Sequence, residues 1–162
     1  MSDLPPPQVI EAYLRAMEHG WAVGEAMPRH LPGCYGCGDS NPQGLGLEVI
    51  ADEGDVVRAE YTFAPHLQGA IGVAHGGAIA ALLDDLLGYV PVRTLTPAVT
   101  RELTVTYHAP VPLGVAVELR ARLDSSEGRV LRISGEVVNA AVVAVVATAV
   151  FITVDARRLV GG

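Results

Sequence analysis

The stretch that decides the fold is "VAHGGAIAALLDDLLGYV", which runs from Val73 to Val90. Two glycines are followed by strong helix formers, and the segment is apolar on almost every side. A helix that is hydrophobic all round must be surrounded by protein. We therefore predict a helix over Gly76–Val90 that fills the centre of the molecule.

Strand patterns lie on both sides of this helix. Residues 45–52 and 55–63 predict a hairpin that turns at Glu53 and Gly54. After the helix, alternation predicts four more strands, at 101–110, 115–124, 129–139 and 142–154, with a tight turn near Asn139. Their inward residues are predicted to be Leu103, Val105, Tyr107, Val117, Leu119 and Ala121. Residues 8–19 have the spacing of a short amphipathic helix. The order predicts an α+β domain with one antiparallel sheet.

Composition narrows the functional classes. Half of the 162 residues are apolar, which predicts a single globular domain. The formal charge of −7 argues against nucleic-acid binding. All 11 basic residues are arginine, so Schiff-base chemistry on lysine is excluded. The longest apolar run, Ala140–Ile152, is too short to span a bilayer, and the first residues lack the pattern of a signal peptide. We expect a cytoplasmic protein with no membrane partner.

The two cysteines stand close together in "CYGC", at Cys34 and Cys37. This spacing is one half of a zinc-ribbon pattern without the second half. A turn-rich segment follows it, whereas redox-active pairs usually open a helix. We interpret the pair as a structural turn, with metal or redox chemistry as the alternative.

Five spaced motifs together carry a family resemblance. They are "CYGCG" followed by "NPQGLGL", then "LQG", then "AHGG" with an aspartate nine residues after the histidine, then "TRELTVTYHAPVPLG". Over about Gly33–Val154 the chain resembles the hotdog-fold acyl-CoA thioesterases of the phenylacetic-acid-degradation (PaaI-like) type. The resemblance implies a sheet wrapped round a central helix and a homodimer with a continuous double sheet. On this basis we divide the chain into an N-terminal helix and linker (1–33), a hotdog domain (34–156) and a tail (157–162).

Asp84 and Asp85 lie in the middle of the apolar helix. Burying a charge costs several kcal/mol unless the charge is paired with another group or takes part in function. The two carboxylates are therefore candidates for a functional or structural role. The resemblance places the catalytic carboxylate at Asp84. Asp85 lies ~100° further round the helix, so the two cannot share a face, and we assign Asp85 a rim or structural role.

The helix start provides a second candidate group. The first N–H groups of a helix have no intrahelical partner and lie at the positive end of its dipole. Gly76 and Gly77 also let a thioester approach the backbone closely. The resemblance assigns the Gly76 amide to the thioester carbonyl. Because Asp84 lies ~12 Å along the same helix, a partner chain must supply one of the two groups.

Other candidate residues are less specific. The resemblance matches Thr100 to a residue that helps to hold the attacking water. His75 could set the turn, and a role as catalytic base is the weaker alternative. The resemblance indicates that some relatives carry a carbonyl-binding asparagine where this chain has Gly69, so this second donor is either missing or replaced by the neighbouring Gln68. His66 is interpreted as a loop residue. Candidate partners for the CoA phosphates are Arg93, Arg101, Arg157 and Arg158.

The sequence therefore predicts hydrolysis of an acyl-CoA to a carboxylic acid and CoA. Asp84 would activate a water or attack the thioester itself. No metal and no cofactor are expected, since coenzyme A is part of the substrate. A non-catalytic acyl-CoA-binding or sensing module on the same fold is the alternative, and the paired His and carboxylate of hotdog dehydratases are not found. The dimers could pair into a homotetramer.

Overall fold

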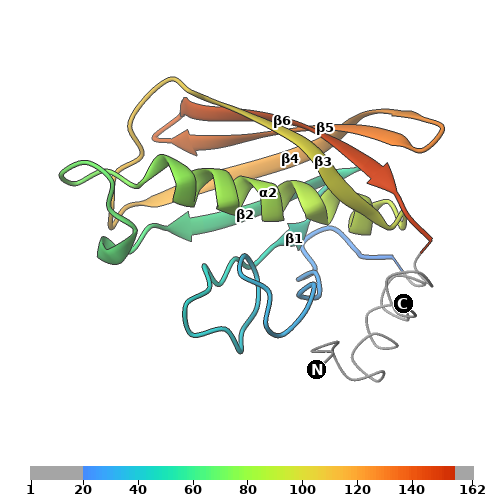
Figure 1. Ribbon diagram of the computed structural model, residues 1–162, viewed down its shortest axis with the longest axis horizontal. Coiled ribbons are helices and arrows are strands. Elements are labelled where there is room, and N and C mark those ends of the chain that lie inside the picture. Colours follow the sequence, from blue (N-terminus) through green and yellow to red (C-terminus); the bar gives the residue numbers. More distant parts are fainter. Residues whose placement is uncertain (1–19, 156–162) are drawn as a thin grey trace.

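The computed structural model describes residues 20–155, so the helix predicted at 8–19, the tail at 157–162, Arg157 and Arg158 lie outside the described residues. The elements are β1 (Ile50–Ala51), β2 (Val56–Thr62), the 3-10 turn η1 (Pro65–Leu67), α2 (Gly76–Arg93), β3 (Ala98–Tyr107), β4 (Ala116–Glu127), β5 (Val130–Asn139) and β6 (Val142–Thr153). Figure 1 shows α2 lying along one face of the sheet.

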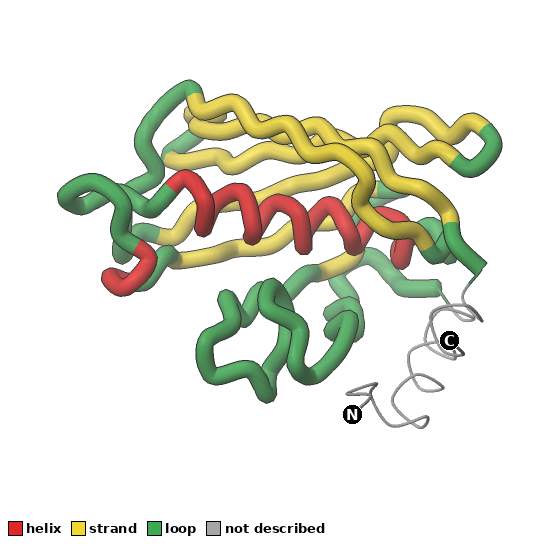
Figure 2. Tube along the Cα trace, viewed as in Figure 1, coloured by secondary structure: helices red, strands yellow, loops and turns green. Residues whose placement is uncertain are grey.

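The strands form one antiparallel sheet in the order β1-β2-β4-β5-β6-β3. The chain leaves α2, turns, and returns as β3 at the edge of the sheet beside β6. Figure 2 shows the sheet curving over the helix, with the loops of residues 20–49 beyond the β1 and β2 side. This architecture confirms the predicted α+β hotdog fold, in which one long helix fills a curved sheet.

Leucines of α2 form the centre of the core. Leu82, Leu83, Leu86 and Leu87 are each 0 % exposed. The inward residues of β4 meet them from the sheet side and are also buried, namely Val117, Leu119 and Ala121. Each fully buried side chain of this size contributes roughly 1.5–3 kcal/mol relative to an exposed one. This packing fixes the position of α2, and with it the positions of the two aspartates.

The first predicted strand is shorter than expected. The sequence predicts a strand over 45–52, but β1 contains only Ile50 and Ala51. The backbone before β1 is hydrogen-bonded to the preceding loop: the Leu45 and Leu47 N–H groups donate to the Tyr35 and Gly36 carbonyls. Leu45 and Leu47 therefore pair with the loop that contains the cysteines, and the Val49 carbonyl accepts a hydrogen bond from the Met27 N–H.

The turn between β5 and β6 has an unusual backbone. Asn139 and Val142 are paired across the strands, so Ala140 and Ala141 form a two-residue loop. Their φ angles are 47° and 67°. Positive φ at both central positions is the mark of a type I′ hairpin turn, which favours Asn and Gly rather than alanine. The predicted turn is confirmed, with strained residues at its tip.

Within residues 20–155, no helix combines the length and the hydropathy needed to cross a bilayer.

Candidate active site

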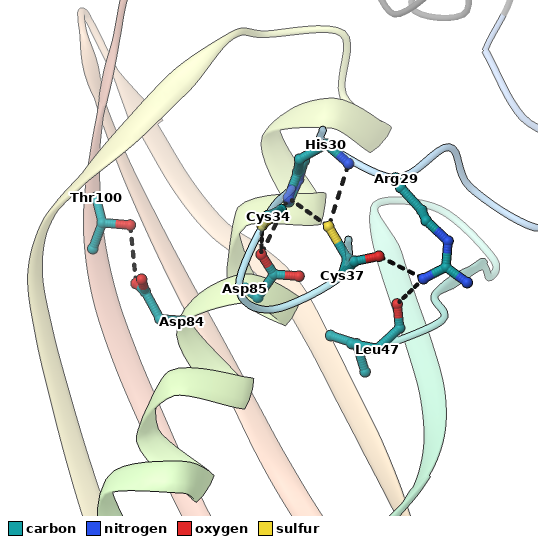
Figure 3. A network of polar contacts seen from close by, with 8 residues as sticks. All are labelled: Arg29, His30, Cys34, Cys37, Leu47, Asp84, Asp85 and Thr100. Atoms are coloured by element: carbon teal, nitrogen blue, oxygen red, sulfur yellow. Dashed lines mark hydrogen bonds and ion pairs between the residues drawn. The ribbon is translucent and has the colours of Figure 1, made fainter. Parts of the chain in front are cut away.

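The first feature of the site is a contact between α2 and the edge strand β3. The Thr100 hydroxyl donates a hydrogen bond of 3.0 Å to Oδ1 of Asp84. Thr100 is exposed near the start of β3, and Asp84 is partly buried at the middle of α2. Figure 3 shows the two side chains directed toward one another. The contact holds the carboxylate in one orientation while leaving it accessible from outside the chain.

The second feature is the start of α2. His75 is the N-cap residue, and its Nδ1 accepts a hydrogen bond of 2.9 Å from the Gly77 N–H. A Cβ at position 77 would lie 3.0 Å from that nitrogen, so glycine permits the cap. The Tyr107 hydroxyl donates to the Gly76 carbonyl at 2.7 Å. In residues 20–155, no acceptor is found for the Gly76 N–H, as expected for the first residue of a helix. That amide can therefore bind a substrate oxygen.

The loop before α2 folds back on itself. The His75 N–H donates to the Leu67 carbonyl at 2.7 Å, and the Gly69 N–H donates to the Val73 carbonyl at 2.9 Å. Oε1 of Gln68 accepts a hydrogen bond from the Gly72 N–H. A Cβ at position 69 would lie 2.9 Å from the Cα of His75, so this close turn requires glycine. The Gln68 side chain thus stabilises the turn of this loop through its hydrogen bond with the Gly72 N–H.

The structure does not bring all the predicted residues together within one chain. Gly76 and Asp84 both belong to the continuous helix α2, eight residues apart. At ~1.5 Å of rise per residue their backbones are ~12 Å apart. A base and the carbonyl it serves must come within about 3 Å of a shared water. Within a single chain, the Thr100–Asp84 pair and the Gly76 amide are therefore too far apart to act on the same thioester.

Asp85 points away from Asp84, toward the loop that contains the cysteines (Figure 3). Its Oδ1 lies 3.3 Å from Nδ1 of His30 and 3.3 Å from Sγ of Cys34. Sγ of Cys37 lies 3.4 Å from the same His30 nitrogen. These contacts join α2 to the loop of residues 30–37, which is consistent with the structural role predicted for Asp85.

Burial and proximity perturb the ionisation of this group. Burial alone would lower the pKa of His30, but hydrogen bonds with Asp85 and both cysteines hold that pKa well above its usual value. Burial alone would raise the pKa of Asp85, yet the hydrogen bond and charge of His30 bring it below its usual value. The hydrogen bond with His30 also lowers the pKa of Cys34. These groups behave as one coupled unit.

The candidate arginines that the structure describes are already engaged. Nη2 of Arg93 donates to the Asp52 carbonyl, and Arg101 pairs with Glu102 at 2.8 Å. A groove of about 760 Å³ crosses the outer face of the sheet beside Arg58 and Arg120. It includes neither Asp84 nor Gly76. The structure does not single out an arginine for the CoA phosphates.

Comparison with known proteins places these two features in a family. A model of the thioesterase superfamily matches residues 71–146, which include the start of α2, Asp84 and Thr100. Over this range the chain is similar to the thioesterase superfamily. The superfamily match leaves His30 and both cysteines outside the matched range.

Individual relatives agree with this assignment. The chain is 37 % identical over 120 residues to the acyl-coenzyme A thioesterase THEM4 of Bos taurus, covering 71 % of this chain and 49 % of that protein. The chain thus spans about half the length of the curated relatives it matches. A crystal structure described as a thioesterase superfamily protein superposes with a TM-score of 0.72 at 27 % identity, covering 90 % of this chain and 74 % of the other.

A more distant structure supports the fold alone. A Streptococcus mutans protein, solved bound to acetyl-CoA, superposes with a TM-score of 0.63 at 22 % identity. The match covers 67 % of this chain and 88 % of the other. Its likeness shows that this chain has the same arrangement of sheet and helix.

Sequence reasoning missed two residues near the candidate site. Tyr107 lies on the same face of β3 as Leu103 and Val105, as the alternation predicted, and its hydroxyl reaches the start of α2. The side chain is nevertheless 48 % exposed, on a strand at the edge of the sheet, and its contact with Gly76 was not predicted. His30 was not singled out, although it precedes Cys34 by four residues. A search for metal-binding residue types near "CYGC" would have found it.

Proposed function

We propose that the chain hydrolyses an acyl-CoA thioester to a carboxylic acid and free CoA. The observation that carries the proposal is the Asp84 carboxylate, held by the Thr100 hydroxyl on the central helix of a thioesterase-superfamily fold. The named activity of the bovine relative supports the same reaction. The cytoplasmic location expected from the sequence remains part of this proposal.

Two routes use the same carboxylate. In the first, ionised Asp84 takes a proton from a water, whose oxygen attacks the thioester carbonyl. In the second, Asp84 attacks the carbonyl itself, and water then hydrolyses the resulting anhydride. In both routes the C–S bond breaks and the sulfur leaves as the CoA thiolate, which takes up a proton. Thr100 fixes the attacking group, and the Gly76 amide stabilises the negative charge on the carbonyl oxygen.

The separation of Asp84 from Gly76 supports a composite site. We place the Gly76 of one protomer opposite the Asp84 of its partner, with two helices α2 antiparallel about a two-fold axis. The edge strand β3 supports this arrangement, because an uncovered edge offers backbone groups for pairing with another strand. Val99 and Tyr107 of β3 are 44 % and 48 % exposed, as expected of a strand that has more surface to cover. A homotetramer would pair two such dimers.

The experiment compares wild type with Asp84→Asn in thiol release from a panel of acyl-CoA substrates with different chain lengths and aromatic content. Loss of the carboxylate should lower the hydrolysis rate by roughly 10²–10⁴-fold. Isothermal titration with free CoA should give similar affinities for both proteins. Full activity in Asp84→Asn would refute the mechanism. A wild-type protein that binds acyl-CoA without turnover would instead establish the binding module.

A further inference from the structure

The residues clustered around Asp85 have no role in the proposed hydrolysis. One ligand atom from each of His30, Cys34, Cys37 and Asp85 lies within 4.8 Å of the others. These atoms are an imidazole nitrogen, two thiol sulfurs and a carboxylate oxygen. Deprotonated, each is a metal ligand, and imidazole with thiolate ligands in a tetrahedral set selects Zn²⁺.

Three of the six distances between the four atoms are close to those of a tetrahedral shell, and all six are within 4.8 Å. With Zn–S bonds of about 2.3 Å and Zn–N or Zn–O bonds of about 2.0–2.2 Å, neighbouring ligand atoms lie about 3.3–3.8 Å apart. The contacts from His30 Nδ1 to Asp85 Oδ1 and from Cys34 Sγ to Asp85 Oδ1 are both 3.3 Å. The contact from Cys37 Sγ to His30 Nδ1 is 3.4 Å. Small shifts would bring all four atoms onto one metal ion.

The carboxylate of Asp85 has a buried oxygen that lacks a hydrogen-bond partner among residues 20–155. The Asp85 side chain is 11 % exposed, and this oxygen is its Oδ2. A buried carboxylate with an unsatisfied oxygen is costly. A cation at the centre of the cluster would offset that cost. Both cysteines are free thiols, so their sulfurs are available as ligands.

The surrounding backbone is built to hold the four ligands. The His30 N–H donates to Sγ of Cys37 at 3.3 Å, a bond that positions this sulfur. The His30 ring packs on Tyr89, with ring centroids 4.2 Å apart, which fixes its orientation. A Cβ at position 36 would lie 2.2 Å from Cγ of Asp85, so glycine is required for the loop to approach α2 this closely.

The loop is also anchored from outside the cluster. Nη1 of Arg29 donates to the Cys37 carbonyl and to the Leu47 carbonyl. The Leu47 N–H donates back to the Gly36 carbonyl at 2.9 Å. The ligands are therefore held in place by the same pairing that replaced the first part of the predicted strand at 45–52. Preorganised ligands of this kind favour a metal site over a loose turn.

We infer that His30, Cys34, Cys37 and Asp85 form a structural zinc site that joins the loop of residues 30–37 to α2. Four protein ligands close the coordination shell, as in structural rather than catalytic zinc sites. The two cysteine thiols lose their protons when the metal binds. The site lies beside Asp84 in sequence but on another face of α2, so it supports the helix without contacting the thioester. This inference revises the sequence-based expectation of no metal.

The test uses tag-free protein purified without chelator. Elemental analysis by mass spectrometry should give about one zinc ion per chain. After removal of zinc under reducing conditions, Co²⁺ should bind with the intense d–d bands of a tetrahedral site and a thiolate-to-cobalt charge-transfer band. Wild-type protein that takes up neither zinc nor cobalt after reduction would overturn the inference, whether or not the cysteines had formed a disulfide.

Variants separate a built site from adventitious metal. Cys34→Ser and Asp85→Asn should each lose the bound zinc when dialysed against a competing chelator that leaves wild type loaded. The matched control is Asp84→Asn, which removes the neighbouring carboxylate and should retain the metal and the cobalt spectrum. Equal retention in Cys34→Ser and wild type, or equal loss in Asp84→Asn, would contradict the site. If Cys34→Ser fails to fold, the wild-type cobalt spectrum still decides the question. Metal content does not depend on whether the protein hydrolyses acyl-CoA.

Discussion

The hydroxyl of Thr100, on the edge strand β3, donates a hydrogen bond of 3.0 Å to the carboxylate of Asp84, on the central helix. The bond joins two elements that are separated by the turn between α2 and β3. Among residues 20–155 the bond engages Oδ1, which leaves Oδ2 of Asp84 for a water or a thioester carbon. The consequence for the proposed reaction is that the orientation of the attacking group depends on a residue at the rim of the sheet.

Replacing the Thr100 hydroxyl tests that dependence. Thr100→Val keeps the shape of the side chain but removes the donor, and we expect kcat for acyl-CoA hydrolysis to fall about tenfold, equivalent to ~1.4 kcal/mol. Thr100→Ser keeps the hydroxyl and serves as the matched control, with a rate close to that of wild type. Steady-state kinetics on both variants measure the difference. Equal rates for Val and Ser would show that the hydrogen bond has no part in catalysis.

The Gly76 amide can be removed with little change to the backbone. Proline is accepted at the first position of a helix, and the preceding residue, His75, already has the extended conformation that proline favours, with φ −66° and ψ 133°. Gly76→Pro deletes the N–H proposed to stabilise the oxyanion, so kcat should fall by about 10²–10³-fold.

Gly76→Ala controls for added bulk at the helix start. Its Cβ would make ordinary contacts of 3.4 Å with the Tyr107 ring, and its N–H is retained. We expect Gly76→Ala to keep most of the wild-type rate. Circular dichroism should show the same helix content in Gly76→Ala and Gly76→Pro. Similar losses in Gly76→Ala and Gly76→Pro would mean that bulk, rather than the missing donor, impairs the reaction.

The strained turn between β5 and β6 gives a prediction about stability. Ala140 and Ala141 have φ angles of 47° and 67°, which asparagine and glycine adopt at lower cost. The double substitution Ala140→Asn with Ala141→Gly should raise the free energy of unfolding by about 1 kcal/mol. Thermal unfolding should show a melting temperature higher by about 2–4 °C. Ala147→Gly introduces a glycine into the buried interior of β6 instead of the turn, and it should lower the melting temperature. No gain from the turn substitutions would mean that the positive φ angles cost little here.

The sequence was sufficient for the parts of the fold that depend on hydrophobic periodicity. The apolar run after Gly76 and the alternation around Val117 and Leu119 predicted the central helix and an inner strand, and both are observed. The strand predicted at 45–52 was mostly wrong, because alternation does not reveal which backbone a segment pairs with. Here that backbone is the loop around Gly36.

Helix geometry related the candidate residues to one another only where they share one element, whereas Thr100 on β3 was indicated by the family resemblance. Asp84, Asp85 and Gly76 lie on α2, so helix geometry alone shows that the two carboxylates diverge and that Gly76 is too distant from Asp84. The contact between Asp85 and His30 spans 55 residues and depends on how the loop folds over the helix. Periodicity carries no information about such a contact, which is why His30 was missed.

The composite site makes a prediction that a single chain cannot satisfy. Asp84→Asn and Gly76→Pro homodimers should each be almost inactive. In a mixed dimer, one of the two sites combines the intact Gly76 of the first variant with the intact Asp84 of the second. Random pairing makes half of the dimers mixed, so about a quarter of the wild-type sites should be restored.

The measurement is the acyl-CoA hydrolysis rate of the two variants co-expressed with different affinity tags and purified through both tags in sequence. We predict that this mixed species recovers about half of the wild-type rate, since one of its two sites is intact. A mixed species as inactive as either parent would contradict the account, because it would place both groups of each site on the same chain or exclude one of them from the reaction.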